Sequence, residues 1–484
     1  MVMALHRAGL RVGMDVVYNH TTTSGQAQSS VLDRIVPGYY QRLDGSGVVE
    51  RSTCCANTAT EHLMMGKLMS DSIELWATQY KIDSFRFDLM GHQPRAVMEA
   101  LGRRVDAATG RRVNLIGEGW NFGEVADGSR FVQASQLSLN SSGIATFSDR
   151  ARDALRGGGP SDSGKALVER KGWLNGLGND RDAPGAAAAL AQAAELVRVG
   201  LAGSLRDYAL VDLHGKPVLL SDIDYHGQPA GYASQPDEVV NYVENHDNQT
   251  LFDNNVYKLP VQTSTAERAR VQVLALAVNA FSQGVAYFHA GVDTLRSKSM
   301  DRNSFDSGDW FNRLDWTYRD NYFATGLPPA RENEANFPFI APLLREAGIK
   351  PAPADIAWTR DAFRDLLRIR ASSTLFRLRS AADIKQRLSF PQPANSHDPL
   401  LIAGHLQGHG YPGANFREIL YLLNAGTQER SLELPSELGK HYVLHPVQRD
   451  ANAADSRAKQ ALYDMANGRF TVPARTAVVY VLEQ

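Results

Sequence analysis

Charged side chains that could do acid–base or nucleophilic chemistry follow several short apolar runs of this sequence. Arg86 lies near the end of the run at 82–87, and Asp88 follows this run directly. Alternate residues of a strand project from the same face, so the two side chains are neighbours. A fixed cation lowers the pKa of a carboxyl group and keeps it ionised, as a nucleophile requires. An aspartate after a strand is often only a turn or helix cap, but the pairing with Arg86 favours a catalytic role for Asp88.

A second carboxylate, Glu118, lies between Gly117 and Gly119 and precedes Trp120. Glycines allow close backbone approach, and Trp120 is placed to shield Glu118 from water. Desolvation and nearby anions predict a raised pKa and a protonated general acid. Ordinary core packing explains Trp120 equally well at this point. Asp247, a third carboxylate, suits the stabilisation of developing positive charge.

Histidines follow two further apolar runs. His20 follows the run at 10–17, and His246 follows the run at 239–243. Either histidine could be a core residue with satisfied hydrogen bonds. Their positions beside acids at predicted strand ends favour hydrogen bonding to substrate hydroxyls instead. The same two segments contain three further polar candidates, Asp15, Asn19 and Asn248.

These residues can act together only in a fold that brings the ends of their strands close to one another. Strands are predicted at 10–17, 82–87, 113–116, 144–147, 239–243 and 285–288, and helices at 61–80, 94–105, 186–199, 266–281 and 361–370. The helix at 61–80 is expected to bury Leu63, Met64, Leu68, Ile73, Leu75 and Trp76. Alternating strands and helices predict an α/β body with a parallel sheet. In a β/α barrel the carboxyl ends of the strands meet at one mouth, where the active site lies.

The pattern changes near residue 382 to short strands between Gly, Pro and Asn turns. This predicts an all-β sandwich at 381–484 after a catalytic β/α domain at 1–380.

Composition narrows the classes of ligand. The 484 residues carry a net charge of −2 with 43% hydrophobic residues, so neither nucleic acid nor a membrane is expected as a partner. No apolar stretch is long enough to cross a bilayer, and the first ten residues do not resemble a signal peptide, which leaves the compartment open. Cys54 and Cys55 are adjacent and suit neither a disulfide framework nor a CxxC metal site. They are interpreted as two mostly buried side chains or as a vicinal disulfide.

Four ordered motifs resemble the signature regions of the α-amylase family of glycoside hydrolases. They are the segments 15–20 (DVVYNH), 85–88 (FRFD), 117–120 (GEGW) and 245–247 (NHD). The resemblance implies that Asp88 is the nucleophile, Glu118 the general acid/base and Asp247 the stabiliser of the transition state. It also implies that Arg86, His20 and His246 bind the sugar at the cleavage point. Such enzymes retain anomeric configuration, with the two reacting carboxyls roughly 5–5.5 Å apart.

Within that family, several segments look like those of the pullulanase-type debranching enzymes. These segments are 52–57, 81–90, 117–121, 156–160, 246–251 and 307–312. The resemblance implies a (β/α)8 TIM-type barrel with a C-terminal sandwich, and hydrolysis of α-1,6 branch linkages in an α-glucan. It implies that Leu89, Trp120 and Asn248 shape sugar binding. No cofactor is expected, and a structural calcium stays open.

Two departures from that family accompany the resemblance. Only six strands of the eight-stranded barrel are found, and the first two are missing. We therefore expect an N-terminally truncated fragment that folds poorly alone. Asn303 stands where the relatives usually have Asp, which puts one outer substrate contact in doubt.

Three rival interpretations remain at this point. The chain could be a catalytically inactive glycan-binding remnant, or an α-1,4-acting amylase of the same fold. It could also be a metal-dependent hydrolase, since histidines and carboxylates are metal ligands. Arg86 counts against a metal, because a guanidinium beside a ligand carboxylate competes with a dication.

Overall fold

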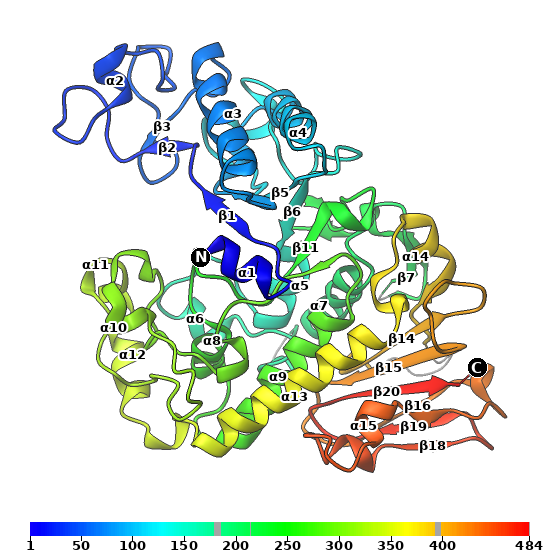
Figure 1. Cartoon of the computed structure of the whole chain (residues 1–484). Helices are drawn as coiled ribbons and strands as arrows, with labels where there is room; N and C mark the ends of the chain where they lie inside the picture. The colour runs from blue at the N-terminus through cyan, green and yellow to red at the C-terminus, as the bar shows by residue number, and fades with distance from the viewer. Residues whose placement is uncertain (179–184, 213, 393–397, 484) are drawn as a thin grey trace. The chain divides into compact units, whose positions relative to one another are not determined.

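The computed structural model describes residues 1–178, 185–212, 214–392 and 398–483 (Figure 1). The chain divides into two compact units. Unit 1 comprises Met1–Phe147 with Tyr232–Val240, and unit 2 comprises Ser148–Gly231 with Asn241–Gln484. Within the described ranges, no helix combines the length and the apolar character needed to cross a membrane.

Unit 1 is built on a sheet whose strands follow the order β1-β4-β5-β6-β11. Parallel pairing joins β1 to β4, β4 to β5 and β5 to β6. The register sets Asp15 beside Arg86 and Arg86 beside Ile116, so the carboxyl ends of three strands are neighbours. The strands are β1 (Gly13–Val16), β4 (Ser84–Phe87), β5 (Asn114–Gly117), β6 (Ala145–Ser148) and β11 (Val239–Asn241).

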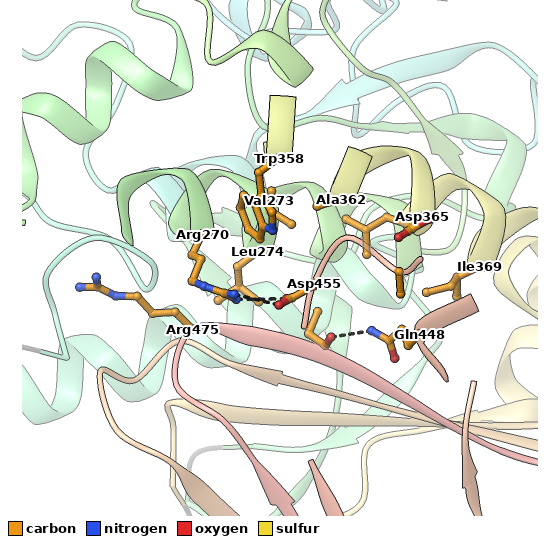
Figure 2. A pocket seen from close by; sticks show the side chains of 13 residues that line it. Arg270, Val273, Leu274, Trp358, Ala362, Asp365, Ile369, Gln448, Asp455 and Arg475 are labelled. Atoms are coloured by element: carbon orange, nitrogen blue, oxygen red, sulfur yellow. Dashed lines mark hydrogen bonds and ion pairs between the residues drawn. The ribbon is translucent and has the colours of Figure 1, made fainter. Parts of the chain in front are cut away.

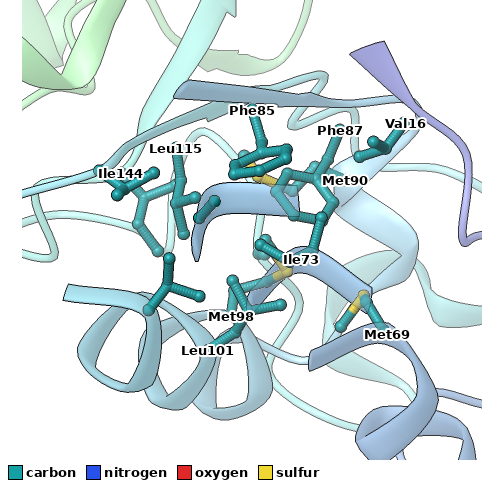
Figure 3. Packing of buried hydrophobic residues seen from close by; sticks show 14 of the residues in the cluster. Val16, Met69, Ile73, Phe85, Phe87, Met90, Met98, Leu101, Leu115 and Ile144 are labelled. Atoms are coloured by element: carbon teal, nitrogen blue, oxygen red, sulfur yellow. The ribbon is translucent and has the colours of Figure 1, made fainter. Parts of the chain in front are cut away.

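The core of unit 1 lies between this sheet and two helices, α3 (Leu63–Thr78) and α4 (Arg95–Thr109). Phe85 and Phe87 alternate with polar residues along β4 and are almost fully buried. They pack with Met69 and Ile73 of α3 and Met98 of α4 (Figure 3). Residues four apart lie on one helix face, which is how α3 presents an apolar stripe to the sheet.

The stripe of α3 differs from the one predicted. The helix buries Met65, Met69, Ile73 and Ala77, whereas Leu63 is 80% exposed and Leu75 is 48% exposed. The sequence has apolar residues on more than one side of this helix, so only packing against the sheet decides which side is buried.

Shorter elements complete unit 1. Strands β2 and β3 pair antiparallel, with His20 opposite Asn57 and Thr21 opposite Ala56. The bounds are α1 (Val2–Arg7), β2 (His20–Thr21), α2 (Leu32–Ile35) and β3 (Ala56–Asn57).

Unit 2 begins with helices around α9 (Thr265–Phe281), which is buried from Val271 to its end. Ser264 caps α9 by accepting from the Glu267 amide at 3.3 Å. Several helices share one apolar core, including Phe252 of α8 and Ile340 of α12. The helices are α5 (Asp149–Arg156), α6 (Ala166–Glu169), α7 (Ala186–Leu201), α8 (Leu251–Lys258), α10 (Gly308–Asn312), α11 (Ala330–Asn333), α12 (Phe337–Leu344), α13 (Pro353–Ser372), α14 (Ala381–Arg387) and α15 (Pro446–Arg449). The short strands among them are β7 (Ala209–Val211), β8 (Pro217–Leu219), β9 (Asp224–Tyr225), β10 (Gln228–Pro229) and β12 (Val285–Ala286).

The C-terminal part of unit 2 consists of two antiparallel sheets. One has the order β13-β14-β15-β20-β17 and the other β16-β19-β18. Both contribute to one core, for example through Leu420, Phe470 and Val478. The strands are β13 (Leu388–Ser389), β14 (Leu401–Gln407), β15 (Glu418–Asn424), β16 (Arg430–Glu433), β17 (Val443–Leu444), β18 (Leu462–Asp464), β19 (Arg469–Val472) and β20 (Thr476–Leu482).

A small cavity marks where these sheets meet α9 and α13 (Figure 2). Arg270 of α9 donates to both carboxylate oxygens of Asp455, at 2.8 and 3.1 Å, and its guanidinium lies 4.9 Å from the Trp358 ring centroid. Trp358 Nε1 and the Asp365 carboxylate of α13 bind the backbone of Ala454. The segment before β18 is therefore fixed to the helices by charged as well as apolar contacts.

Most predicted elements are present, with shifted ends. The strand expected at 10–17 is only Gly13–Val16, and the one at 285–288 only Val285–Ala286. The helix expected at 361–370 begins earlier, at Pro353. Proline is favoured in a first helical turn, and the Asp355 carboxylate accepts from the Ala352 amide at 2.9 Å.

Candidate active site

Arg86 is the centre of the polar cluster in unit 1. Its Nη1 donates to Asp15 Oδ1 at 2.9 Å and to Asp88 Oδ1 at 3.1 Å, and its Nη2 lies 3.0 Å from Glu118 Oε1. The parallel register brings these groups together from the ends of β1, β4 and β5. The sequence predicted that Arg86 pairs with Asp88. In the structure, Arg86 is shared by three carboxylates.

The charge of Arg86 is secured by these neighbours. Burial lowers the pKa of the guanidinium, but Glu118, Asp15 and Asp88 raise it further, and the net pKa is above its usual value. Nη2 makes no well-directed hydrogen bond among the described residues, so its contact with Glu118 is an ion pair. Arg86 is a fixed cation throughout the physiological pH range.

Backbone and amide groups orient the two central carboxylates. Glu118, which is 6% exposed, accepts from the Leu89 amide through Oε2 at 2.9 Å. Leu89 has a left-handed backbone, with φ at 38°. With its amide nitrogen turned toward Asp88, Asn19 donates to Asp88 Oδ2 at 3.2 Å and to the Asp88 carbonyl at 3.1 Å. Asp88 is half-buried.

The glycines beside Glu118 have the role that the sequence predicts. A Cβ on Gly117 would lie 2.7 Å from Met90 Cβ, and one on Gly119 would lie 2.7 Å from the Gln136 nitrogen. Only glycine fits this approach. Trp120, the next residue, is half-buried.

His20 is held by Asn19. In the same amide orientation, the Asn19 oxygen accepts from His20 Nδ1 at 2.8 Å, so Nε2 carries the free lone pair. Burial lowers the pKa of His20 and outweighs the opposing effect of Asp88. His20 Nε2 lies 3.6 Å from Cys54 Sγ.

Cys54 and Cys55 form a vicinal disulfide. Cys54 is exposed and Cys55 half-buried. The interpretation of the cysteines as two mostly buried side chains is therefore wrong, and the interpretation as a vicinal disulfide is confirmed. The pair precedes β3, whose partner β2 contains His20. The spacing of the cysteines in the sequence could not show that they lie near His20.

Three further predicted residues lie in unit 2, on the segment that links β11 to α8. His246 and Asp247 have side chains 45% and 44% exposed, with His246 Nε2 3.5 Å from Asp247 Oδ1. Asn248 has a left-handed backbone, with φ at 62°. Thr250 ends the segment by capping α8 through a 3.1 Å bond from the Asp253 amide.

Three buried charged residues whose roles the sequence did not predict hold this segment. Arg156 donates to the carbonyls of Val243 at 3.1 Å and Gln249 at 2.7 Å. Lys298 Nζ donates to the His246 carbonyl at 2.9 Å. Glu244 is the third. The one available signal was the Gly-rich run after Arg156.

Burial shapes the ionisation of these three groups. It lowers the pKa of Arg156, and it lowers that of Lys298 to about 8 against the opposing effect of Asp301 and Asp253. Glu244 pairs with His289 Nδ1 at 2.9 Å and accepts from the Leu251 amide at 2.6 Å. Its pKa is lowered, because these partners outweigh burial.

Asn303 lies beside buried Asp301. Its backbone N–H donates to Asp301 Oδ1 at 3.0 Å, and the residue is half-buried. Apart from Asn303, the predicted residues fall into two groups. The unit 1 cluster contains Asp15, Asn19, His20, Arg86, Asp88, Leu89 and Glu118, with Trp120 close to Glu118 in the chain, and the unit 2 segment contains His246, Asp247 and Asn248.

Comparison with known proteins supports the resemblance seen in the motifs. Residues 318–483 match the family model described as "Alpha-1,6-glucosidases, pullulanase-type, C-terminal". The chain is 44% identical to "Pullulanase 1, chloroplastic" of Arabidopsis thaliana, over 99% of this chain and 52% of that protein. It is 38% identical to a pullulanase of Klebsiella pneumoniae, over 100% of this chain and 44% of that protein.

Solved structures agree. The crystal structure of Klebsiella pneumoniae pullulanase complexed with maltotriose matches with a TM-score of 0.94 and 38% identity, over 100% of this chain and 46% of that chain. The apo pullulanase of the same organism matches with a TM-score of 0.93 over 52% of its chain. The chain spans about half the length of the curated relatives that it matches. In sequence and in fold, it is similar over its whole length to part of the pullulanases.

Proposed function

We propose that this protein hydrolyses α-1,6-glucosidic branch linkages in pullulan, amylopectin or limit dextrins with retention of anomeric configuration. The observation that carries the proposal is the contact of Asp88 and Glu118 with the two ends of one guanidinium, in a chain similar to pullulanases throughout. Two carboxylates on adjacent guanidinium nitrogens are close enough for a nucleophile and an acid that flank one glycosidic bond.

The chemistry takes two steps. Asp88 attacks the anomeric carbon while Glu118, ion-paired with Arg86 in the free protein and protonated in the substrate complex, gives its proton to the leaving glycosidic oxygen, so one C–O bond forms as the other breaks. Glu118 then removes a proton from water, which attacks the same carbon and releases Asp88. Arg86 orients Asp88 for the first step through the 3.1 Å contact with its carboxylate.

The other predicted residues have supporting roles in the proposal. Asp247 stabilises the positive charge of the transition state, and His20 and His246 hydrogen-bond sugar hydroxyls. Leu89, Trp120 and Asn248 shape the sugar sites. Asp15 and Asn19 act through the contacts with Arg86 and Asp88 described above. Asn303 is an outer contact.

The finer architecture is part of the same proposal. The parallel strands would belong to a (β/α)8 barrel within a catalytic domain at 1–380, and the C-terminal sheets to a sandwich domain at 381–484. The two sheets around one apolar core support the sandwich. We propose no cofactor for the chemistry, because two carboxylates complete it. A calcium ion, if bound, would have a structural role.

Digestion of pullulan tests the function, with reducing ends measured and products separated by chromatography. Maltotriose as the main product is expected. Products cut at α-1,4 bonds would instead identify an amylase. Binding of maltooligosaccharides without release of reducing ends would identify an inactive glycan-binding protein.

A chelator tests the metal-dependent alternative. We expect hydrolysis to continue in EDTA, because Arg86 occupies the space among Asp15, Asp88 and Glu118 that a dication would need. Activity that disappears with EDTA and returns with one divalent metal would overturn the carboxylate mechanism.

A further inference from the structure

The side chains of His20, Cys54 and Cys55 form a compact group beside the unit 1 cluster. Their ligand atoms all lie within 4.8 Å of one another. Cys54 is exposed, and the other two residues are half-buried, so both a reductant and an ion can reach them. Imidazole and thiolate are the ligands that zinc prefers in proteins.

The local fold keeps the group together independently of the disulfide bond. Pairing of β2 with β3 places His20 opposite Asn57. Asn57 is fully buried and donates to Glu124 at 3.0 Å, and it accepts from Thr53 Oγ1 at 2.5 Å. The cysteines therefore lie between two anchored residues, Thr53 and Asn57, and stay near His20 when the S–S bond opens.

The histidine is already oriented as a metal ligand would be. Asn19 accepts from Nδ1 and leaves the Nε2 lone pair facing Cys54 Sγ at 3.6 Å. A hydrogen bond to the second ring nitrogen is the usual way in which proteins fix the tautomer and the ring of a metal-binding histidine.

We propose that reduction of the Cys54–Cys55 disulfide creates a site for a thiophilic divalent cation such as Zn²⁺, bound by His20 Nε2 and the two sulfurs. A dithiol supplies two electrons and two protons to the S–S bond and is itself oxidised to a disulfide. Zn²⁺ then displaces the two thiol protons. Three protein ligands and one water complete a tetrahedral shell.

A second group of possible metal ligands differs from the first because a lysine already pairs with its acidic residues. His405, Glu418 and Glu437 also have ligand atoms within 4.8 Å of one another. There, Lys440 Nζ lies 2.8 Å from both carboxylates and Tyr442 donates to both. Those acids already have a cation, so no metal site is assigned to them.

Zinc would also affect catalysis, and this consequence rests on the proposed function. His20 is a proposed sugar ligand, and a metal on Nε2 would remove its free nitrogen from the substrate. Zinc should then inhibit pullulan hydrolysis by the reduced protein and spare the oxidised one.

Zn²⁺ binding tests the site directly, without any activity assay. The full chain is reduced with a dithiol, freed of it by anaerobic gel filtration, and titrated against a chromophoric chelator. We expect one tight equivalent in the reduced protein and none in the oxidised protein. His20→Gln should weaken binding at least tenfold, and His214→Gln, which alters an exposed histidine, should leave it unchanged.

Single serine variants complete the test. Cys54→Ser and Cys55→Ser should each abolish the tight equivalent of zinc. The circular dichroism of each variant is compared with that of the oxidised parent protein as the control for folding. Equal binding by oxidised and reduced protein, or by His20→Gln, would overturn the three-ligand site. A protein that binds zinc in this way but does not cleave pullulan would keep the metal site and refute the proposed function.

Discussion

The two clusters hold their acidic residues in different ways. In unit 1, Asp88 and Glu118 are fixed through their own carboxylates, which contact Arg86, and Glu118 is 6% exposed. In unit 2, Arg156 and Lys298 bind backbone carbonyls, and the Asp247 side chain stays 44% exposed.

This difference follows from the work that we propose for each group. A nucleophile and an acid must be set to within a fraction of an ångström of the reacting atoms, and a shared cation at a strand end provides that precision. A residue that stabilises charge can be positioned by its segment, provided that the backbone is rigid. Disturbing unit 1 should therefore affect chemistry first, and disturbing the unit 2 supports should affect segment geometry and stability.

The largest effect is expected from Asp88→Asn. Without the nucleophile no glycosyl-enzyme forms, and kcat on pullulan should fall by more than about 10⁴-fold. The unfolding midpoint should change little, since the amide retains the shape of the carboxylate. Substantial residual activity in initial-rate assays would refute the role of Asp88.

Arg86→Gln should break the shared contact in unit 1. Three carboxylates would lose their cation, so we expect about 100-fold lower kcat through misplacement. The free energy of unfolding should fall by about 3 kcal/mol, because Glu118 would be buried without its cation. Urea unfolding and initial rates measure the two effects. Arg86→Lys is the matched control, and it should rescue only part of the activity because lysine lacks the planar fork.

Lys298→Met should disturb the unit 2 segment more mildly. The His246 carbonyl would lose its buried donor, which costs about 1–3 kcal/mol of unfolding free energy. We expect about tenfold lower kcat, without the near-total loss that is expected for Asp88→Asn. An unchanged kcat together with reduced stability would show that the segment does not depend on this contact for its geometry.

The pH dependence of stability should also identify Lys298. Burial lowers its folded pKa to about 8, whereas an unfolded lysine keeps its proton to about 10.4. Between these values the unfolded chain binds more protons, so unfolding free energy should rise with pH. The rise should be larger in the parent than in Lys298→Met. Identical slopes in urea titrations from pH 8 to 10.5 would contradict the assigned shift.

The smallest effect is expected from Asn303→Asp. The side chain is half-buried, and the backbone amide already donates to Asp301. We expect KM to change less than about threefold, since surface changes of this kind stay within roughly 0.5 kcal/mol. A large change in kcat would place Asn303 closer to the chemistry than we propose.

The nearness of the residues in the unit 1 cluster could be predicted from the sequence, because the ends of apolar runs mark where strands end. Asp15 and Arg86 lie near the carboxyl ends of predicted strands and Asp88 and Glu118 just after strands, and the parallel register brings these strand ends together. The sharing of Arg86 was not predictable, since it depends on how three strands align.

The supports of unit 2 were missed for a physical reason. Arg156 reaches Val243 and Gln249 across 87 and 93 residues of sequence, and its targets are carbonyls, which every residue has. No residue type marks such a target. Likewise, Met65 and Met69 of α3 were not predicted to be buried, because only the packed sheet selects one face of that helix.

Trapping of the glycosyl-enzyme tests the central claim most directly. The protein would be incubated with a fluorinated α-glucosyl fluoride that forms the covalent intermediate faster than water removes it, then digested and examined by mass spectrometry. We predict one added sugar on the peptide that contains Asp88, and none in Asp88→Asn. A label on Glu118 or Asp247, or hydrolysis of pullulan with no label at all, would contradict the assignment.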